Sequence, residues 1–208
     1  MDAERERVKL SRALSRVLRH TATRDGVRVG ADGFVAVEEL RRLPRFATLS
    51  DERVREVVGR DEKKRYALRT EARTGALEIR ANQGHSLVGA IDDDKLLERV
   101  VDWPDGQRCI HGTTRKAWGL IRTDGLRPMG RNHIHFAPGY FGEPHVVSGM
   151  RKNCAVFIRL DVEACLREGI PLFRSQNHAI LSPGDSRGRI SPRFFAHVQD
   201  ANGKLLVE

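Results

Sequence analysis

The sequence predicts an α+β protein with two lobes, for three reasons. With 208 residues, the chain exceeds the roughly 100–150 residues of a typical single domain. Segments with helical and with strand-like patterns follow one another without an internal repeat. The composition changes between residues 92 and 107, where an acidic run and a Trp-Pro-Asp-Gly turn interrupt the pattern. We therefore expect one domain over residues 1–100 and a second over residues 101–208.

The first domain begins with three predicted helices. The first lies within residues 8–20, where apolar residues recur at helical spacing: Leu10, Leu14, Val17 and Leu18. The segment VEELRRL predicts a second, short helix that ends before Pro44. A third helix is predicted to start after Ser50, whose side chain suits an N-cap.

A two-stranded hairpin is predicted to complete this domain. The segments RYALR (65–69) and ALEIRA (76–81) have the composition of strands and flank a turn at Thr74-Gly75. Three helices with such a hairpin indicate a winged-helix lobe, a shape often used on nucleic acid. For function, this is an argument from fold-level analogy only.

The second domain is predicted to be richer in strands. The segment RCIHGT (108–113) predicts a strand, followed by an amphipathic helix that stops at Gly125. The segments HIHFA (133–137) and AVFIRLD (155–161) predict two more strands on either side of a loop rich in Gly and Pro. A short helix over residues 162–169 and several closing strands complete a β-rich lobe.

The charge predicts a polyanionic partner. The chain has 37 Lys and Arg against 28 Asp and Glu, a formal charge of +9. Both halves contribute, because 22 basic and 19 acidic residues lie up to Pro104 and 15 and 9 lie beyond it. Nucleic acid is the commonest partner of such a basic protein.

Several classes of protein are excluded. No apolar run reaches the roughly 18 residues of a membrane span, and the charged start is not followed by the apolar core of a signal peptide. The three cysteines are too scattered for a disulfide framework or a zinc knuckle. We expect an intracellular monomer, cytoplasmic or nuclear, with reduced thiols and no membrane partner.

Two basic segments of the first domain are candidates for binding phosphate. Arg19 and His20 close the first predicted helix, and Arg65 follows two lysines before a strand. The helix dipole alone would favour cations at the first place, and a solvated basic turn would explain the second. The polar run 82–86 around Gly84 suits a phosphate or a sugar, and equally an ordinary strand exit.

The second domain adds three groups of polar residues. The segment 111–113 ends a strand and opens a helix, whose N-terminus favours an anion. Arg131, His133 and His135 are predicted to share one face of a strand. Two histidines on one face would suit zinc, but no carboxylate or thiol lies at a ligand-like spacing, so we predict no metal site. Further polar groups lie beside element boundaries, at 148–151 and 174–177.

Missing motifs narrow the chemistry. The chain contains no G-x-G-x-x-G, no P-loop and no G-x-S-x-G. The candidate residues are mostly Arg, His, Ser, Thr and Asn, which bind phosphates and sugars but include no obvious carboxylate base. If a reaction occurs here, a phosphate oxygen of the substrate can be the nucleophile.

Taken in order, these segments resemble the tRNA 2′-phosphotransferase family over nearly the whole chain. Eight segments carry the resemblance: LSRALSRVLRH (10–20), DGFVAVEEL (32–40), KKRYAL (63–68), IRANQGHS (79–86), HGT (111–113), GRNHIHFAPG (130–139), SGMR (148–151) and FRSQNHAILSPGD (173–185). The resemblance implies an N-terminal winged-helix lobe for RNA and a C-terminal, ADP-ribosyltransferase-like lobe for NAD⁺.

The resemblance also implies a reaction. Members of this family transfer an internal RNA 2′-phosphate, left at the splice junction of ligated tRNA, to NAD⁺, which is consumed. The products are RNA with a 2′-OH, ADP-ribose 1″,2″-cyclic phosphate and nicotinamide. Because the substrate phosphate is the nucleophile, this chemistry agrees with the residue types above.

The roles of individual residues follow from the same resemblance. The family's essential Arg-His-Arg-Arg set corresponds to Arg19, His20, Arg65 and Arg131. The arginines are expected to bind the 2′-phosphate, and His20 to contact it or to protonate the departing 2′-oxygen. The implied NAD⁺-binding residues are His111, Gly112, Thr113, His133, Ser148, Gly149, Arg151, Ser175 and Asn177.

The chain departs from the family pattern at two places. The family usually reads Lys-Gln-Arg-Phe where this chain has Lys63-Lys64-Arg65-Tyr66, so the arginine is retained. A Gly-Val pair is common after Asn177, where this chain has His178-Ala179. We expect this second change to alter the turn beside the NAD⁺ site without abolishing binding.

Two other functions stay open. An ADP-ribosyltransferase that caps phosphorylated RNA or DNA ends would use the same NAD⁺ lobe and stop after the first step. A non-catalytic winged-helix nucleic-acid binder would explain the charge and the first lobe, but not the second. The reaction products distinguish these functions, because only a 2′-phosphotransferase releases a free cyclic phosphate of ADP-ribose.

Overall fold

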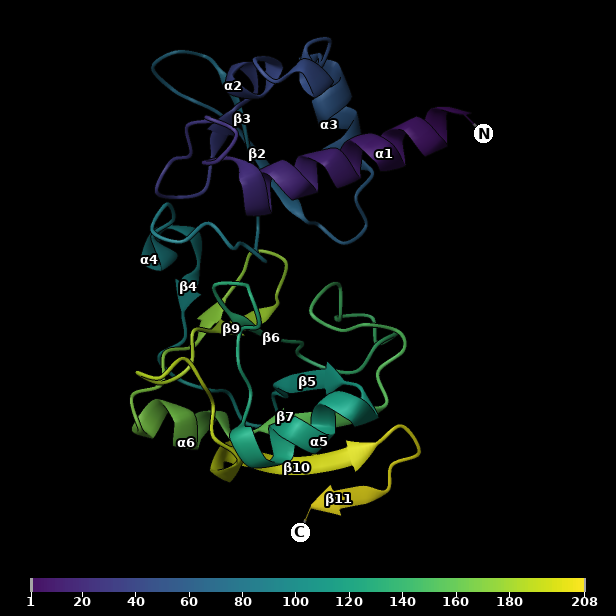
Figure 1. Ribbon diagram of the computed structural model, residues 1–208, viewed down its shortest axis with the longest axis vertical. Coiled ribbons are helices and arrows are strands. Elements are labelled where there is room, and N and C mark those ends of the chain that lie inside the picture. Colours follow the sequence, from purple (N-terminus) through teal and green to yellow (C-terminus); the bar gives the residue numbers. More distant parts are fainter. Residues whose placement is uncertain (1, 208) are drawn as a thin grey trace. The chain divides into compact units, whose positions relative to one another are not determined.

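The computed structural model describes residues 2–207 and contains two compact units, one ending at Leu96 and the other beginning at Leu97. Both units combine helices with small antiparallel sheets, which confirms the α+β class (Figure 1). The division at residue 100 and the RNA and NAD⁺ roles of the two halves stay predictions. Among the described residues, no helix is both long and apolar enough to cross a membrane.

The helices of the N-terminal unit lie close to their predicted places. They are α1 (Asp2–Arg16), which continues into a π-helical turn (Val17–Thr21), then α2 (Val37–Arg41), α3 (Asp51–Gly59) and the short α4 (Asp93–Leu96). The first helix starts before the predicted residue 8, because its charged N-terminal turns extend beyond the apolar stripe. The predicted cap of α3 is confirmed, since the Arg53 backbone N–H donates to Ser50 Oγ at 3.2 Å.

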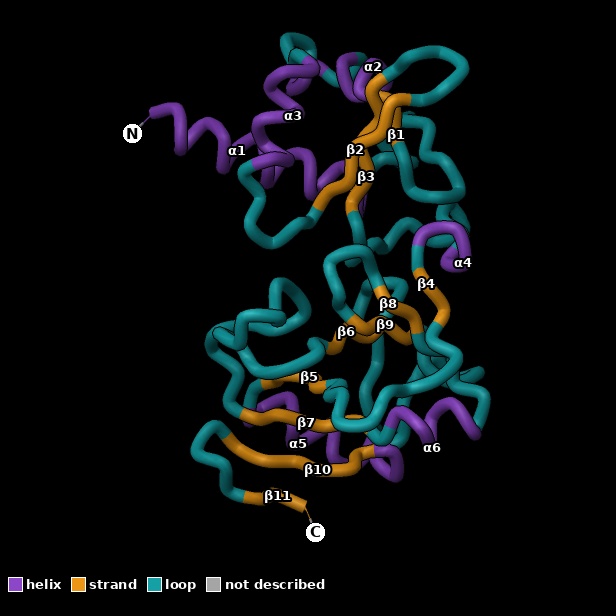
Figure 2. The backbone as a smooth tube through the Cα atoms, turned by 180° about the vertical axis from the view of Figure 1, so that it is seen from behind, coloured by secondary structure: helices purple, strands orange, loops and turns teal. Residues whose placement is uncertain are grey.

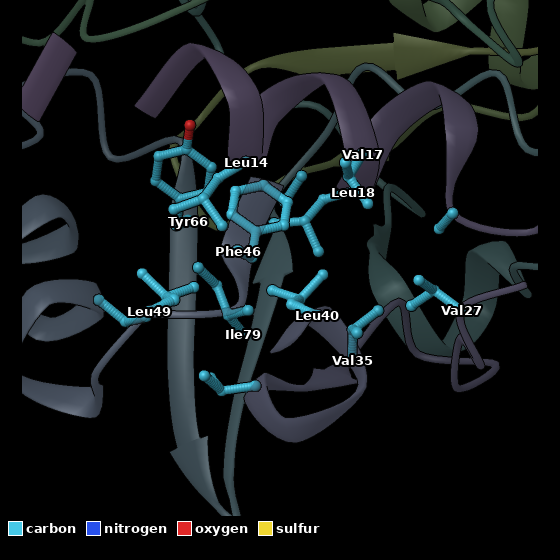
Figure 3. Packing of buried hydrophobic residues seen from close by; sticks show 14 of the residues in the cluster. Leu14, Val17, Leu18, Val27, Val35, Leu40, Phe46, Leu49, Tyr66 and Ile79 are labelled. Carbon is cyan, nitrogen blue, oxygen red and sulfur yellow. The ribbon is translucent and has the colours of Figure 1, made fainter. Parts of the chain in front are cut away.

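A three-stranded antiparallel sheet completes this unit. Its order is β1 (Val35–Ala36), β3 (Leu77–Ala81), β2 (Tyr66–Thr70). The β2–β3 hairpin confirms the two predicted strands. The apolar stripe of α1 continues through the π-helical turn and packs on this sheet, with Leu14 and Leu18 at most 1% exposed beside Ile79 (Figure 3).

The C-terminal unit contains two four-stranded sheets (Figure 2). In one the order is β11 (Leu205–Val207), β10 (Phe195–Asp200), β7 (Val156–Leu160), β5 (Ile110–Thr113). In the other it is β4 (Glu98–Arg99), β8 (Phe173–Arg174), β9 (Ile180–Ser182), β6 (Ile134–Phe136). Two backbone hydrogen bonds of 2.9 Å between Ile110 and Ala137 join the sheets, so the ends of β5 and β6 lie together.

Within its described residues, the C-terminal unit has two α-helices, of which α5 (Arg115–Asp124) packs on the first of these sheets. Thr114 caps α5, and Asp161 caps α6 (Val162–Arg167). Trp118 of α5 packs on Phe195, with ring centroids 6.3 Å apart. The predicted stop at Gly125 is confirmed, because this glycine follows α5 with a φ of +83°.

Candidate functional site

A groove of about 660 Å³ lies along α1 in the N-terminal unit, and we call it the α1 groove. Three of the predicted phosphate-binding residues, Arg19, His20 and Arg65, line it. Seven Lys and Arg side chains border it against three carboxylates: Arg7, Arg12, Arg16, Arg19, Arg60, Lys63 and Arg65 against Glu4, Asp61 and Glu62. The α1 groove is therefore electropositive, as a phosphate site requires.

The π-helical turn and the loop after β3 together hold Arg19 and His20. The Ala22 N–H donates to the Val17 carbonyl at 3.0 Å, five residues back, and such turns occur frequently at functional sites. Ser86 from the loop after β3 donates its backbone N–H to the Arg19 carbonyl at 2.8 Å. Its Oγ lies 2.9 Å from His20 Nδ1. The polar loop singled out from the sequence thus fixes the catalytic candidates.

Gly84 in the same loop lies against the Arg19 side chain. A Cβ added there would lie 3.5 Å from Arg19 Nε and Cζ, which is ordinary van der Waals contact. The φ of Gly84 is +88°, a conformation in which L-residues are strained. The guanidinium of Arg19 therefore rests on a stretch of backbone that favours glycine.

Arg65 is held by Asp61 and Asn82, and neither of them is among the predicted catalytic or NAD⁺-binding residues. Asp61, with a side chain 5% exposed, pairs with the Arg65 guanidinium and accepts its backbone N–H. The Asn82 side-chain amide donates to the Lys64 carbonyl, and the Asn82 N–H to the Arg65 carbonyl, both at 2.8 Å. Lys64 has a φ of +44°, a strained conformation of the kind found at functional sites. A carboxylate four residues before Arg65 was the available signal for Asp61.

In the C-terminal unit, Arg131, Arg151 and His111 form an electropositive cluster. Partial burial lowers the pKa of Arg131, and the charge of Arg151 lowers it further. Burial likewise lowers the pKa of His111; the hydrogen bond of its Nδ1 with the His135 carbonyl, at 2.9 Å, opposes this, and Arg151 lowers it further. Within residues 2–207, neither Arg131 nor Arg151 pairs with a carboxylate. An anion bound here would relieve the repulsion.

The prediction that Arg131, His133 and His135 share a strand face is wrong. Strand β6 begins only at Ile134, and bends occupy residues 131–133. The physical reason is the preceding turn, where Met129 and Gly130 have φ values of +54° and +83° and turn the chain out of the extended conformation. His133 is 4% exposed and packs edge-on against Phe173, while Arg131 is exposed.

Over the part of the chain that the structure describes, no group of three or more His, Cys, Asp or Glu side chains could hold a metal ion.

The segments 111–113 and 148–151 meet where β5 passes the loop that leads to β7. A Cβ on Gly112 would lie 2.4 Å from Met150 Sδ and 2.5 Å from Cys154 Sγ. A Cβ on Gly149 would lie 2.5 Å from the Phe136 carbonyl oxygen, and its φ is +91°. Protein packing thus accounts for both glycines. Thr113 and Ser148 beside them are half-buried.

Ser175 and Asn177 build the turn between β8 and β9. Their side chains are buried, and Ser175 Oγ donates to Asn177 Oδ1 at 2.8 Å and accepts the Ala179 N–H at 3.1 Å. His178, which stands where the family commonly has glycine, has a φ of +63°. The departure noted in the sequence therefore falls on a position whose backbone favours glycine.

The chain is similar to known proteins over most of its length. A family model described as "RNA 2'-phosphotransferase, Tpt1 / KptA family" matches residues 5–184. The tRNA 2′-phosphotransferase 1 of Danio rerio is 42% identical, over 92% of this chain and 85% of its own length. That of Bos taurus is 45% identical, over 93% and 75%. A probable RNA 2′-phosphotransferase of Streptomyces griseus is 33% identical, over 92% and 96%.

Proposed function

The chain belongs to the RNA 2′-phosphotransferase, Tpt1 / KptA family, and on that premise we propose that it transfers an internal 2′-phosphate of RNA to NAD⁺. The substrate is ligated tRNA, phosphorylated at its splice junction, and the products are RNA with a 2′-OH, ADP-ribose 1″,2″-cyclic phosphate and nicotinamide. The N-terminal unit would then be a winged-helix RNA lobe, and the C-terminal unit an ADP-ribosyltransferase-like NAD⁺ lobe. The observation that carries the proposal is the α1 groove, where Arg19, His20 and Arg65 come together.

The arginines hold the 2′-phosphate in this proposal. Each charged hydrogen bond from Arg19 or Arg65 contributes about 1.5–3 kcal/mol to binding. Asp61 and Asn82 fix the Arg65 backbone, so that its guanidinium is oriented before the substrate arrives. Arg131 is assigned to the 2′-phosphate by the family resemblance alone, and cations of this kind stabilise the charge that develops on a phosphate during transfer.

His20 is assigned to the phosphate or to the departing 2′-oxygen. Ser86 orients the imidazole through Nδ1, at 2.9 Å. This leaves the role toward the substrate to Nε2, which donates a hydrogen bond to the phosphate or delivers a proton to the 2′-oxygen as the bond to phosphorus breaks.

The cluster in the C-terminal unit fits an anionic dinucleotide. Arg131 and Arg151 make no ion pair within residues 2–207. The charge of Arg151 lowers the pKa of Arg131 and that of His111. When bound, NAD⁺ supplies the electrophilic ribose carbon and the nicotinamide leaving group. The residues assigned to it are His111, Gly112, Thr113, His133, Ser148, Gly149, Arg151, Ser175 and Asn177. The buried ones among these shape the site, while Arg151 pairs with a phosphate of the dinucleotide.

An RNA oligonucleotide with one internal 2′-phosphate tests the proposal. We expect NAD⁺-dependent loss of the phosphate from the RNA and release of a cyclic phosphate of ADP-ribose, both identified by mass spectrometry. Retention of the phosphate with and without NAD⁺ would refute the proposal. An ADP-ribose that stays attached to an RNA end would identify an end-capping transferase instead, and RNA binding without NAD⁺ consumption a non-catalytic binder.

A further inference from the structure

Two arginines of the α1 groove stand apart from their neighbours. Arg7, Arg60 and Arg65 each pair with a carboxylate, at Glu4, Glu56 and Asp61. Arg12 and Arg16 are exposed, and neither hydrogen bonds nor pairs with a carboxylate within residues 2–207. Arg12 and Arg16, which both lie on α1, are therefore positive charges of the α1 groove that no paired carboxylate neutralises.

The spacing of this pair is regular and continues to the phosphate site. Arg12 and Arg16 lie four residues apart, and Arg19 and His20 follow one turn later. Four residues of helix advance by about 6 Å along the same side. Like charges at this spacing destabilise a helix by about 0.2–0.5 kcal/mol. The helix dipole favours cations in the last turn, which accounts for Arg16 but not for Arg12, four residues before the end of α1.

We propose that Arg12 and Arg16 bind backbone phosphates of the RNA strand next to the nucleotide that carries the 2′-phosphate. This inference rests on the proposed function, since it takes Arg19, His20 and Arg65 as the site of that phosphate. An extended polyanion fits the observation better than a single small anion, because the cations form a row along the helix that ends at the 2′-phosphate site. Contacts of this kind position a strand without reading its sequence.

A binding experiment with a charge-neutral variant tests this inference. The Arg12→Gln/Arg16→Gln variant keeps two good helix formers and removes both charges. Its affinity for a single-stranded RNA oligonucleotide is measured by fluorescence anisotropy over a series of salt concentrations. Arg55→Gln serves as the matched control, because Arg55 is exposed on α3 and does not line the α1 groove.

We expect the double variant to bind RNA about 10- to 100-fold more weakly at low salt, because each of the two lost contacts is exposed to solvent and contributes about 3- to 10-fold to affinity. The slope of log K against log salt should become shallower by about 1.4, since each phosphate contact to a single strand contributes about 0.7. Arg55→Gln should match the wild type. Circular dichroism checks that α1 stays folded, and Arg12→Lys/Arg16→Lys should recover the salt slope.

The oligonucleotide without its 2′-phosphate separates this inference from the proposed function. Contacts to backbone phosphates do not involve the 2′-phosphate, so the double variant should lose affinity for both oligonucleotides by the same factor. An affinity and a salt slope equal to those of the wild type would overturn the inference, and so would a loss limited to the 2′-phosphorylated RNA. If the wild-type protein binds RNA in this way but transfers no phosphate, the proposed function fails and the RNA contact stands.

Discussion

The two units arrange their candidate residues in opposite ways. In the N-terminal unit, Arg19, His20 and Arg65 border an open groove, while the apolar core lies on the other side of α1. In the C-terminal unit, Ser175 and Asn177 are buried in a hydrogen-bonded turn. A long cation can reach an anion from the surface of a folded unit, whereas a pocket for a small ligand is lined by side chains that are held in place by the surrounding structure.

This difference predicts that substitutions at the site of the first unit change activity without changing stability, whereas substitutions at the buried candidates of the second unit change both. Removing a groove cation should lower activity with little effect on unfolding. Changing a buried C-terminal candidate, such as Ser175 or Asn177, should affect both.

The largest expected effect is that of Arg19→Ala. Loss of one donor to a charged transition state lowers a rate by about 100- to 1000-fold, and the apolar core of the N-terminal unit does not include this residue. Single-turnover phosphate transfer and the thermal midpoint are measured together, with the exposed Arg24→Ala as the control. A large drop in the midpoint of Arg19→Ala would contradict the separation.

Next in size is Gly149→Ala, which tests the second unit. A left-handed backbone and a contact of 2.5 Å with the Phe136 carbonyl oxygen should together cost at least about 2 kcal/mol of unfolding free energy. Gly112→Ala should cost less, because its backbone is not left-handed and its close neighbours are side-chain atoms of Met150 and Cys154 and not a backbone carbonyl. Urea denaturation of both variants and of the wild type checks this order of stabilities. A Gly149→Ala variant as stable as the wild type would show that the loop adapts without cost.

Asn82→Ala examines where the separation ends in the first unit. The lost hydrogen bond to the Lys64 carbonyl should cost about 0.5–1.5 kcal/mol of unfolding free energy. Displacement of Arg65 should lower the transfer rate by about tenfold or more. Adding Lys64→Gly should recover part of the rate, since glycine adopts the left-handed conformation without strain. No recovery would show that the strain at Lys64 is not what Asn82 opposes.

Acid should weaken the second unit through His111. Burial lowers the pKa of this histidine in the folded state, so its contribution to stability is fully present above the unfolded value of about 6.5 and is lost as the pH falls through the folded value. The thermal midpoint of the wild type should therefore fall more between pH 7.5 and 5 than that of His111→Gln. Parallel curves would show that His111 does not contribute to this pH dependence.

The smallest effect is expected of His178→Gly, which should stabilise the turn between β8 and β9. A left-handed L-residue costs about 1–2 kcal/mol, which the substitution by glycine removes. The greater conformational freedom of glycine in the unfolded chain opposes this gain by about 0.5–1 kcal/mol. The net gain is a few tenths of a kcal/mol to about 1 kcal/mol in urea denaturation. Gln176→Gly in the same turn has no positive φ and should destabilise instead.

Local signals allowed much of the first unit to be predicted. The apolar spacing on α1, the cap at Ser50 and the turn at Thr74-Gly75 depend on residues close in sequence, and the structure confirms each of them. The same holds for the stop at Gly125.

The one wrong prediction, the shared strand face at 131–135, and the features that were not predicted depend on details of the backbone or on distant residues. The left-handed Met129 and Gly130 precede the bends at 131–133, so that β6 starts only at Ile134, and no local pattern marks a methionine for that conformation. The burial of Ser175 and Asn177 follows from the pairing of β8 with β9 around them. Asp61 could have been found, because a carboxylate four residues from an arginine is a common ion-pair spacing.

The π-helical turn at Val17–Thr21 has a geometric consequence for how a helix presents neighbouring residues. Successive side chains of an α-helix diverge by about 100°, so adjacent residues seldom point at one ligand. A π turn closes its hydrogen bond over five residues and thereby narrows that angle. The side chains of Arg19 and His20, although consecutive in sequence, can thus contact the same ligand. Deletion of one residue here would restore the α-helical pitch and splay the two side chains apart, although every other contact of α1 could persist.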